Sequence, residues 1–394
     1  MTEKALIVCA FLLCGRASAQ FVDDFPGPTV ALDPTGRQGW RVATGDGSAT
    51  LELRQGGSGY ASILVDATHD QRGIWWALIE RDATGIDLTR LGLPGQALRI
   101  EARLRVSHAP RRVNLQLQTQ RTTDYHSHLM EFDIADTDNW HTISMTTHGF
   151  DARPGDRVVA HVALMDWGLE QYRVDIDYVR VDVVDTATAG PDQGAGIPYH
   201  PPVADPKTFA YVLPVAQDGM IDTEYADVRM GQWCTRDRER QLRLRAVDAT
   251  HYVLLRWDLA AFAGRRVVGH GQLELTTHSV ERSADELKDF GQVRVVEILA
   301  GDPRWHDDTV TTQSLCQGKP LTRVLNPQPI IDWPVTEGDG GKTYLTIGNP
   351  VLQRLIDGKT LGIAIKPLGA IHAAFHTAQT DGGQRAPVLR FNLE

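Results

Sequence analysis

Apolar and polar residues alternate in short runs through almost the whole chain, and Gly, Pro, Asp and Asn separate these runs. A period of two residues is typical of β-strands that bury one face, whereas helical periodicity is scarce here. Only residues 349–358, NPVLQRLIDG, have the pattern of a short helix. The sequence therefore predicts an all-β protein of the sandwich type. The clearest expected strands are 98–106, 112–120, 129–134, 157–167, 172–184, 251–259, 271–280, 292–299, 360–368 and 387–393.

The expected strands fall into two groups that are separated by a change in composition. Residues 186–206, TATAGPDQGAGIPYHPPVADP, are rich in Gly, Pro and Ala without an apolar period, which is typical of a linker. The flanking segments, 20–185 and 207–394, are each long enough to fold around a core of their own. We therefore expect two β-sandwich domains, jelly-roll-like in type, joined by a Gly/Pro-rich linker.

The first 19 residues differ from the rest of the chain. A charged start is followed by the apolar run ALIVCAFLLC and by the small residues Ala17, Ser18 and Ala19. This order is typical of a cleaved secretory signal peptide, with Gln20 as the first mature residue. The apolar run is well short of the roughly 20 residues that span a bilayer, and no later segment could span one. We therefore expect a protein secreted to the periplasm or the medium, with no membrane span.

The cysteines leave one disulfide possible in an oxidising compartment. The chain has four cysteines, and Cys9 and Cys14 belong to the expected signal peptide. The remaining two, Cys234 and Cys316, could form one disulfide within the C-terminal half, or they could be two buried thiols. No cysteine spacing predicts a zinc site.

The charge balance limits the class of partner. The chain carries 50 acidic and 40 basic residues, a formal charge of -10. This excess of negative charge disfavours nucleic acid as a partner. Sequence does not set the oligomeric state.

The expected strand 112–120 has two chemically different faces. Val113, Leu115 and Leu117 point to one side, and a row of amides points to the other. Amides supply donors and acceptors that match sugar hydroxyls, although such a row can also be a solvated sheet face. The amide row consists of Asn114, Gln116, Gln118 and Gln120.

The turn after this strand carries Arg121, Tyr125, His126 and His128. A lyase acting on a uronic-acid polymer needs a base, an acid and a group that neutralises the carboxylate, and these side chains could fill those roles. Two other uses stay open. The side chains could simply bind sugar, or the two histidines could chelate a metal.

Further candidates lie outside this turn. A metal bound by His126 and His128 would need Asp133 or His141 as a third ligand. Asp175, Asp177 and Asp182 could hold a structural calcium, and no other cofactor is expected. No GxSxG motif and no distinctive pair of carboxylates predicts a serine hydrolase or a glycosidase.

Aromatic residues supply a second clue to sugar binding, because sugar rings present apolar faces that dock on indole and phenol planes. Trp75 and Trp76 are adjacent, so they must point to opposite faces of a strand and only one can be in the core. The candidates are Trp75, Trp76, Trp140, Trp167 and Tyr172, and of these Trp76, Trp167 and Tyr172 are the expected platforms.

Several short motifs of the C-terminal half carry a family resemblance. VLLRWDL is followed by GQLELTTHS, DPRWHDDTVTT, YLTIGNPVLQRLIDG and a closing PVLRFNL. In this order, residues 206–394 resemble the DNRLRE family of secreted β-sandwich domains, which is related to alginate-binding carbohydrate-binding modules. The family usually has a tryptophan where this chain has Thr312 and Gln313, so the resemblance implies no ligand preference.

The N-terminal half resembles jelly-roll and galactose-binding-like modules that are attached to polysaccharide-degrading enzymes. This resemblance rests on the opening FVDDF and on the ending MDWGLEQYRVDIDYVRVDV. The two resemblances imply a secreted protein that binds an extracellular polysaccharide, as part of polysaccharide breakdown. The alternative is a polysaccharide lyase that acts by β-elimination on a uronic-acid polymer, with its active site in the N-terminal domain.

Overall fold

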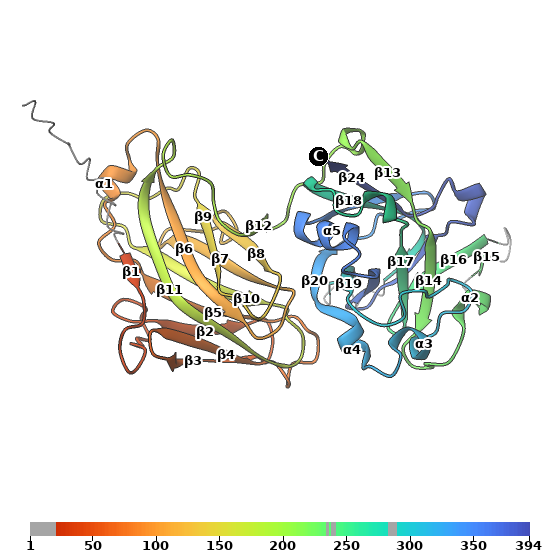
Figure 1. Ribbon diagram of the computed structural model, residues 1–394, viewed down its shortest axis with the longest axis horizontal. Coiled ribbons are helices and arrows are strands. Elements are labelled where there is room, and N and C mark those ends of the chain that lie inside the picture. The colour runs from red at the N-terminus through yellow and green to blue at the C-terminus, as the bar shows by residue number, and fades with distance from the viewer. Residues whose placement is uncertain (1–20, 234–235, 238–241, 283–289) are drawn as a thin grey trace, which may run out of the picture.

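The computed structural model describes residues 21–394 except 234–235, 238–241 and 283–289. The described residues form four antiparallel sheets that lie in two pairs (Figure 1). The chain is therefore all-β, as its alternating pattern predicts. The expected signal peptide and Cys234 lie outside the described residues, so cleavage and the disulfide stay predictions.

The first pair of sheets comes from residues 21–198. One sheet has the order β3 (Thr50–Gly57), β4 (Tyr60–Asp66), β11 (Gln171–Asp185), β6 (Gln96–Val106), β9 (His141–Thr146), with β1 (Phe21–Asp23) beside β11. The other has the order β12 (Ala195–Pro198), β8 (Leu129–Ile134), β7 (Arg111–Thr119), β10 (Val158–Met165), β5 (Trp76–Asp82), β2 (Arg41–Gly45). A short helix, α1 (Leu88–Leu91), precedes β6.

The second pair comes from residues 211–393. One sheet has the order β13 (Tyr211–Pro214), β24 (Val388–Leu393), β18 (Val267–Glu281), β23 (His372–His376), β16 (Leu242–Val247), β15 (Arg236–Asp237), with β21 (Lys342–Ile347) beside β18. The other has the order β14 (Gln217–Asp222), β17 (His251–Arg256), β22 (Gly362–Leu368), β19 (Gln292–Ile298), β20 (Leu325–Trp333). The helices are α2 (Met230–Trp233), α3 (Thr312–Cys316), α4 (Leu321–Val324) and α5 (Asn349–Ile356).

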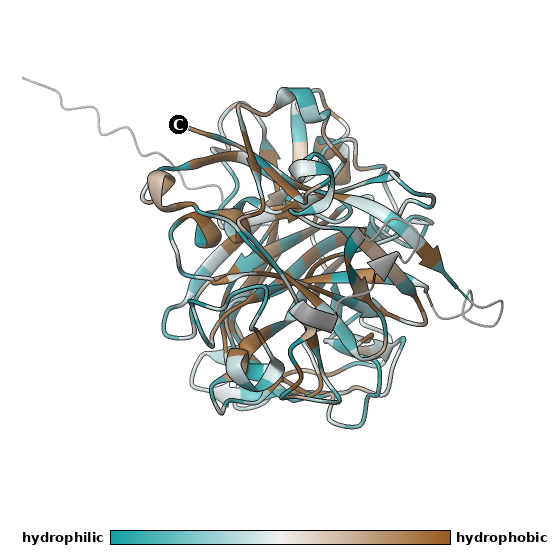
Figure 2. Cartoon of the chain, turned by 90° about the vertical axis from the view of Figure 1, so that its right-hand side faces the viewer, coloured by the Kyte–Doolittle hydropathy of each residue, from teal (hydrophilic) through white to brown (hydrophobic). Residues whose placement is uncertain are grey.

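Each pair of sheets encloses its own apolar core. On β7, Val113, Leu115 and Leu117 are at most 1% exposed and join the core of the first pair. Burying an aliphatic side chain of this size contributes roughly 1.5–3 kcal/mol, so the alternation itself holds the two layers together. Figure 2 shows the same alternation as brown and teal segments along the strands.

The expected helix at 349–358 is confirmed. Pro350 stands in its first turn, where a missing N–H costs nothing, and Gly358 follows its end at a φ of 67°. Its apolar residues face β18 and are buried, and no helix among the described residues is long and apolar enough to cross a membrane. The buried residues of α5 are Val351, Leu352, Leu355 and Ile356.

The expected linker is only partly a linker. Residues 195–198 form β12, which pairs with β8 of the first pair of sheets. Ile197 is buried, and its side chain lies so close to Gly348 that a Cβ there would collide with it. The segment therefore packs against the residue that precedes α5, rather than passing freely between two domains.

Arginines join the two pairs of sheets. Arg354 of α5 binds Asp133 of β8 and Glu297 of β19, with Nη2 at 2.9 and 2.8 Å from the two carboxylates. Arg112 of β7 donates to Ile330 O of β20 at 3.2 Å. In Figure 1 this junction lies where β8 and β12 approach β20 and α5. The two sandwiches thus meet through buried, directional contacts.

Candidate functional site

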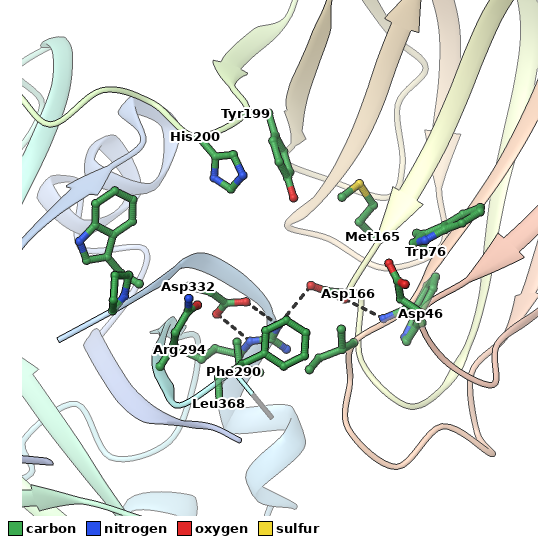
Figure 3. A pocket seen from close by; sticks show the side chains of 15 residues that line it. Asp46, Trp76, Met165, Asp166, Tyr199, His200, Phe290, Arg294, Asp332 and Leu368 are labelled. Atoms are coloured by element: carbon green, nitrogen blue, oxygen red, sulfur yellow. Dashed lines mark hydrogen bonds and ion pairs between the residues drawn. The ribbon is translucent and has the colours of Figure 1, made fainter. Parts of the chain in front are cut away.

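The main candidate site is a cavity of about 390 Å³ between the two pairs of sheets (Figure 3). Trp76, Asp166 and Tyr199 line it from the first half of the chain. Arg294, Asp332 and Trp333 line it from β19 and β20 of the second half. Neither half of the chain alone could form it.

Trp76 lies flat on the sheet because its neighbour has no side chain. The strand register places it between Gly45 of β2 and Met165 of β10. A Cβ on Gly45 would fall on the indole ring, so only glycine allows this position. Trp75 points the other way, is 1% exposed, and donates from Nε1 to Gly168 O at 3.0 Å. The two faces that the sequence predicts for this pair are therefore observed.

The polar floor of the cavity is organised by Arg294. Its Nε and Nη2 donate to Asp332 at 2.9 and 2.6 Å, and Nη2 also donates to Asp166 at 3.1 Å. Nη1 donates to Gly73 O at 2.9 Å. The guanidinium is 3% exposed, so both carboxylates are held at fixed positions on the cavity surface.

Asp166 at this floor and Lys366, which is not among the residues that line the cavity, have shifted pKa values. Burial raises the pKa of Asp166 to about 6, although Arg294 and the Trp75 N–H oppose the shift. Lys366 lies opposite Arg294 in the β19–β22 register, and burial, with Arg294 adding to it, lowers the pKa of Lys366 to about 8. Such pairs of shifted groups are common at functional sites and in structural ion networks alike.

The opposite wall is a cluster of rings. His126 stacks on Tyr199 with ring centroids 4.6 Å apart, and the His200 ring lies edge-on to Tyr199 at 4.1 Å. Burial raises the pKa of Tyr199 to about 12, so its phenol stays protonated and can donate a hydrogen bond. His126 is not itself among the lining residues, but it contacts both Tyr199 and His200, which are.

The predicted amide row is not an open binding face. Asn114 and Gln116 are 1% and 6% exposed. Gln116 donates to the carbonyl of Tyr125, because the turn after β7 folds back beside the strand. Gln120 bonds Asp156, and Gln118 is half-buried. The alternation is as predicted, but Asn114 and Gln116 are buried, and Gln116 and Gln120 already bond other groups of the protein.

The four residues proposed for lyase chemistry do not converge. Arg121 forms ion pairs with Asp151 and Asp156 at 2.9 and 2.7 Å, so its charge is already neutralised. The Tyr125 side chain is 60% exposed. His128 contacts the Phe150 ring at 4.9 Å in a separate pocket beside Arg121, while His126 stacks on Tyr199.

Two predicted sugar platforms belong to the core instead. Trp167 is fully buried and Tyr172 is 3% exposed. Trp167 donates to Arg112 O at 2.7 Å, and the Tyr172 hydroxyl donates to Trp167 O at 2.8 Å. Both rings belong to the core of the first sandwich, so neither presents a face to a ligand.

The predicted metal and calcium ligands have other partners. Asp133 binds Arg354, and His141 lies 3.4 Å from Asp136, so neither joins His126 and His128. Asp175 and Asp177 each pair with an arginine of β6 at 2.7 Å, and Asp182 lies 4.0 Å from Arg180. Cys316 is buried.

Comparisons with known proteins show no family for the chain. A scan against protein-family models finds no match, and a search of curated proteins finds none either, so the DNRLRE resemblance stays a prediction. Similar solved structures include several carbohydrate-binding modules. One is a family 11 module from Clostridium thermocellum in complex with a β-1,3-1,4-mixed-linked tetrasaccharide, with 13% identity, a TM-score of 0.27, and coverage of 41% of this chain and 94% of that chain.

A second solved structure spans almost the whole chain. It is the N-terminal CBM22-1–CBM22-2 tandem domain of Xyn10C from Paenibacillus barcinonensis, with 9% identity and a TM-score of 0.27. The alignment covers 95% of this chain and 96% of that chain. At TM-scores this low, neither likeness bears on function.

Proposed function

We propose that this is a secreted protein that binds an extracellular polysaccharide, and that the cavity between the two sandwiches is its binding site. The observation that carries the proposal is the pairing of aromatic walls with a fixed polar floor. Trp76 and Trp333 line the cavity, and Arg294 holds Asp166 and Asp332 beside them. A sugar ring stacks its C–H face on an aromatic plane while its hydroxyls bond carboxylates.

The dimensions of the cavity suit a short stretch of glycan. Its volume of about 390 Å³ lies in the range of roughly 300–1,000 Å³ that is usual for small-ligand sites. The floor is also preorganised, because Arg294 already fixes both carboxylates. Binding then costs little side-chain ordering, which leaves more of the contact energy as affinity.

The charges around the cavity favour a neutral polymer. Asp46, Asp166 and Asp332 line it, and Arg294 is the cation among its lining residues. A polyuronate would bring further carboxylates toward these acids, and like charges at close range oppose binding. Arg121 is already paired with two aspartates, and Tyr125 does not line the pocket that Arg121 shares with His128. We therefore propose binding of a neutral glycan and no lyase reaction.

The test measures affinity for a panel of polysaccharides by calorimetry and affinity electrophoresis. The panel holds xylan, mixed-linkage β-glucan, mannan and, as the anionic comparison, alginate. We expect binding to at least one neutral polymer, weakened about tenfold in Trp76→Ala, which corresponds to about 1.4 kcal/mol of lost stacking.

Trp140→Ala is the matched control. Trp140 is also half-buried, but its ring packs with Tyr60 and Arg105 on the other sheet of the first pair. Its loss should leave affinity unchanged. Equal affinity of wild type and Trp76→Ala for every polymer bound, or binding of alginate alone, would contradict the proposal.

A further inference from the structure

A second cluster of chemically active side chains lies outside the lining of the cavity. His278 is on β18, His376 is the last residue of β23, and Asp339 lies in the loop before β21. His376 is fully buried and His278 is half-buried. The proposed glycan site uses none of these residues.

A bulge and two glycines bring the three together. The pairing of β18 with β23 shifts between Thr277 and Ser279, so His278 sits in the bulge, on the same side of the sheet as His376. Asp339 stands between Gly338 and Gly340, whose φ values are 88° and 85°. These left-handed positions suit glycine and turn the loop back toward the two strands.

The three potential ligand atoms lie close to one another. His376 Nε2 lies 2.8 Å from Asp339 Oδ1, and His278 Nδ1 lies 3.6 Å from the same oxygen. All three ligand atoms are within 4.8 Å of one another. Ligands about 2.1 Å from a tetrahedral zinc ion are about 3.4 Å apart, so small side-chain rotations would satisfy the ion.

A cation already occupies this convergence point. Arg385 Nη1 lies 3.0 Å from Asp339 Oδ1 and 3.2 Å from His376 Nε2. Its Nε also pairs with Asp381 at 3.0 Å, and its side chain is 34% exposed. Arg385 can therefore keep its bond to Asp381 while a smaller, doubly charged ion takes the place of its Nη1.

We propose that His278, Asp339 and His376 bind a divalent transition-metal ion such as Zn²⁺, which displaces Arg385 Nη1. Two imidazoles and one carboxylate suit zinc and its neighbours in the first row better than calcium or magnesium. Three protein ligands leave a coordination position for water or for an oxygen of a ligand.

The test uses the full mature protein without a histidine tag, freed of metal by a chelator. Zn²⁺ is titrated by calorimetry, and Co²⁺ is followed by its visible absorption bands. We expect a single ion per chain and the intense bands of tetrahedral cobalt. His278→Ala and Asp339→Asn should each weaken binding by more than about tenfold, and Arg385→Ala, which removes the competing cation, should tighten it.

The control is His306→Ala. His306 belongs to another group of neighbouring ligand atoms, with Asp307 and Asp308, and its side chain is exposed. The control should bind as the wild type does, and circular dichroism should show every variant folded. No Zn²⁺ binding by the wild type, or binding that survives both His278→Ala and Asp339→Asn, would overturn the proposal.

Discussion

Asp166 shows how one buried carboxyl can serve two purposes. It accepts the Trp75 N–H at 2.9 Å and the Arg294 guanidinium, so it fixes a turn of the first sandwich against a strand of the second. Yet burial raises its pKa to about 6, because the charged form of the carboxyl is less stable at this buried position than in water. The same carboxyl faces the cavity that we propose for glycan binding.

Asp166→Asn should therefore change how stability depends on pH. The pKa of an unfolded Asp is about 3.9, so between about pH 4 and 6 the folded protein binds more protons and loses stability as pH rises. The variant lacks this titration. Relative to it, the wild type should lose up to about 3 kcal/mol of unfolding free energy between pH 4 and pH 7.

Urea unfolding of both proteins at pH 4 and pH 7 measures this difference. Asp46→Asn, which removes an exposed carboxyl of the same cavity, controls for the loss of a charge. If the unfolding free energies of the wild type and Asp166→Asn differ by the same amount at both pH values, the pKa of Asp166 is not raised.

At the scale of elements, α5 and β12 bind the two sandwiches together. The apolar spacing and Pro350 predict α5, because they are local signals. No local signal predicts β12, since Ala195, Gly196 and Pro198 are poor strand residues. That strand exists because its backbone completes the edge of β8 and because Ile197 fills a space beside Gly348.

Arg354→Met tests the ion network that α5 carries. The Asp133 and Glu297 side chains are only 4% and 3% exposed, so removing their shared cation leaves two buried charges uncompensated. We expect a loss of about 3–5 kcal/mol in unfolding free energy. The triple variant Arg354→Met, Asp133→Asn, Glu297→Gln should recover most of it. A single variant as stable as the wild type would show that the network contributes little.

At the scale of the whole molecule, the fold follows from the sequence more readily than the sites do. The alternation of Val113, Leu115 and Leu117 with amides predicts a two-faced strand. It does not reveal that Asn114 and Gln116 are buried, nor that Gln116 bonds the carbonyl of Tyr125 in the following turn. The sequence predicts that Trp167 lies in a turn, but tertiary packing places its ring in the core.

The two candidate sites arise from long-range contacts. Asp166, Arg294 and Asp332 are more than a hundred residues apart at the widest, and each belongs to an unremarkable local pattern. His278 and His376 lie close together because β18 and β23 are neighbours in a sheet, and a bulge in this pairing places both side chains on the same side of the sheet. A single sequence contains no pattern that predicts which of these distant residues come close together in the fold.

Arg294 offers the sharpest test of the idea that the two sandwiches work as one binding unit. It joins Gly73 and Asp166 of the first half to Asp332 of the second. Arg294→Gln leaves two acids at the junction without their shared cation, so we expect a loss of about 3–5 kcal/mol in the coupling of the two units. Calorimetry should show one unfolding transition in the wild type and two in the variant, and the variant should bind glycan more weakly than the wild type does.

Arg243→Gln is the control, because Arg243 pairs with Asp308 within the second half. Should Arg294→Gln unfold in a single unshifted transition and bind glycan as the wild type does, the junction would be a passive contact between two independent modules.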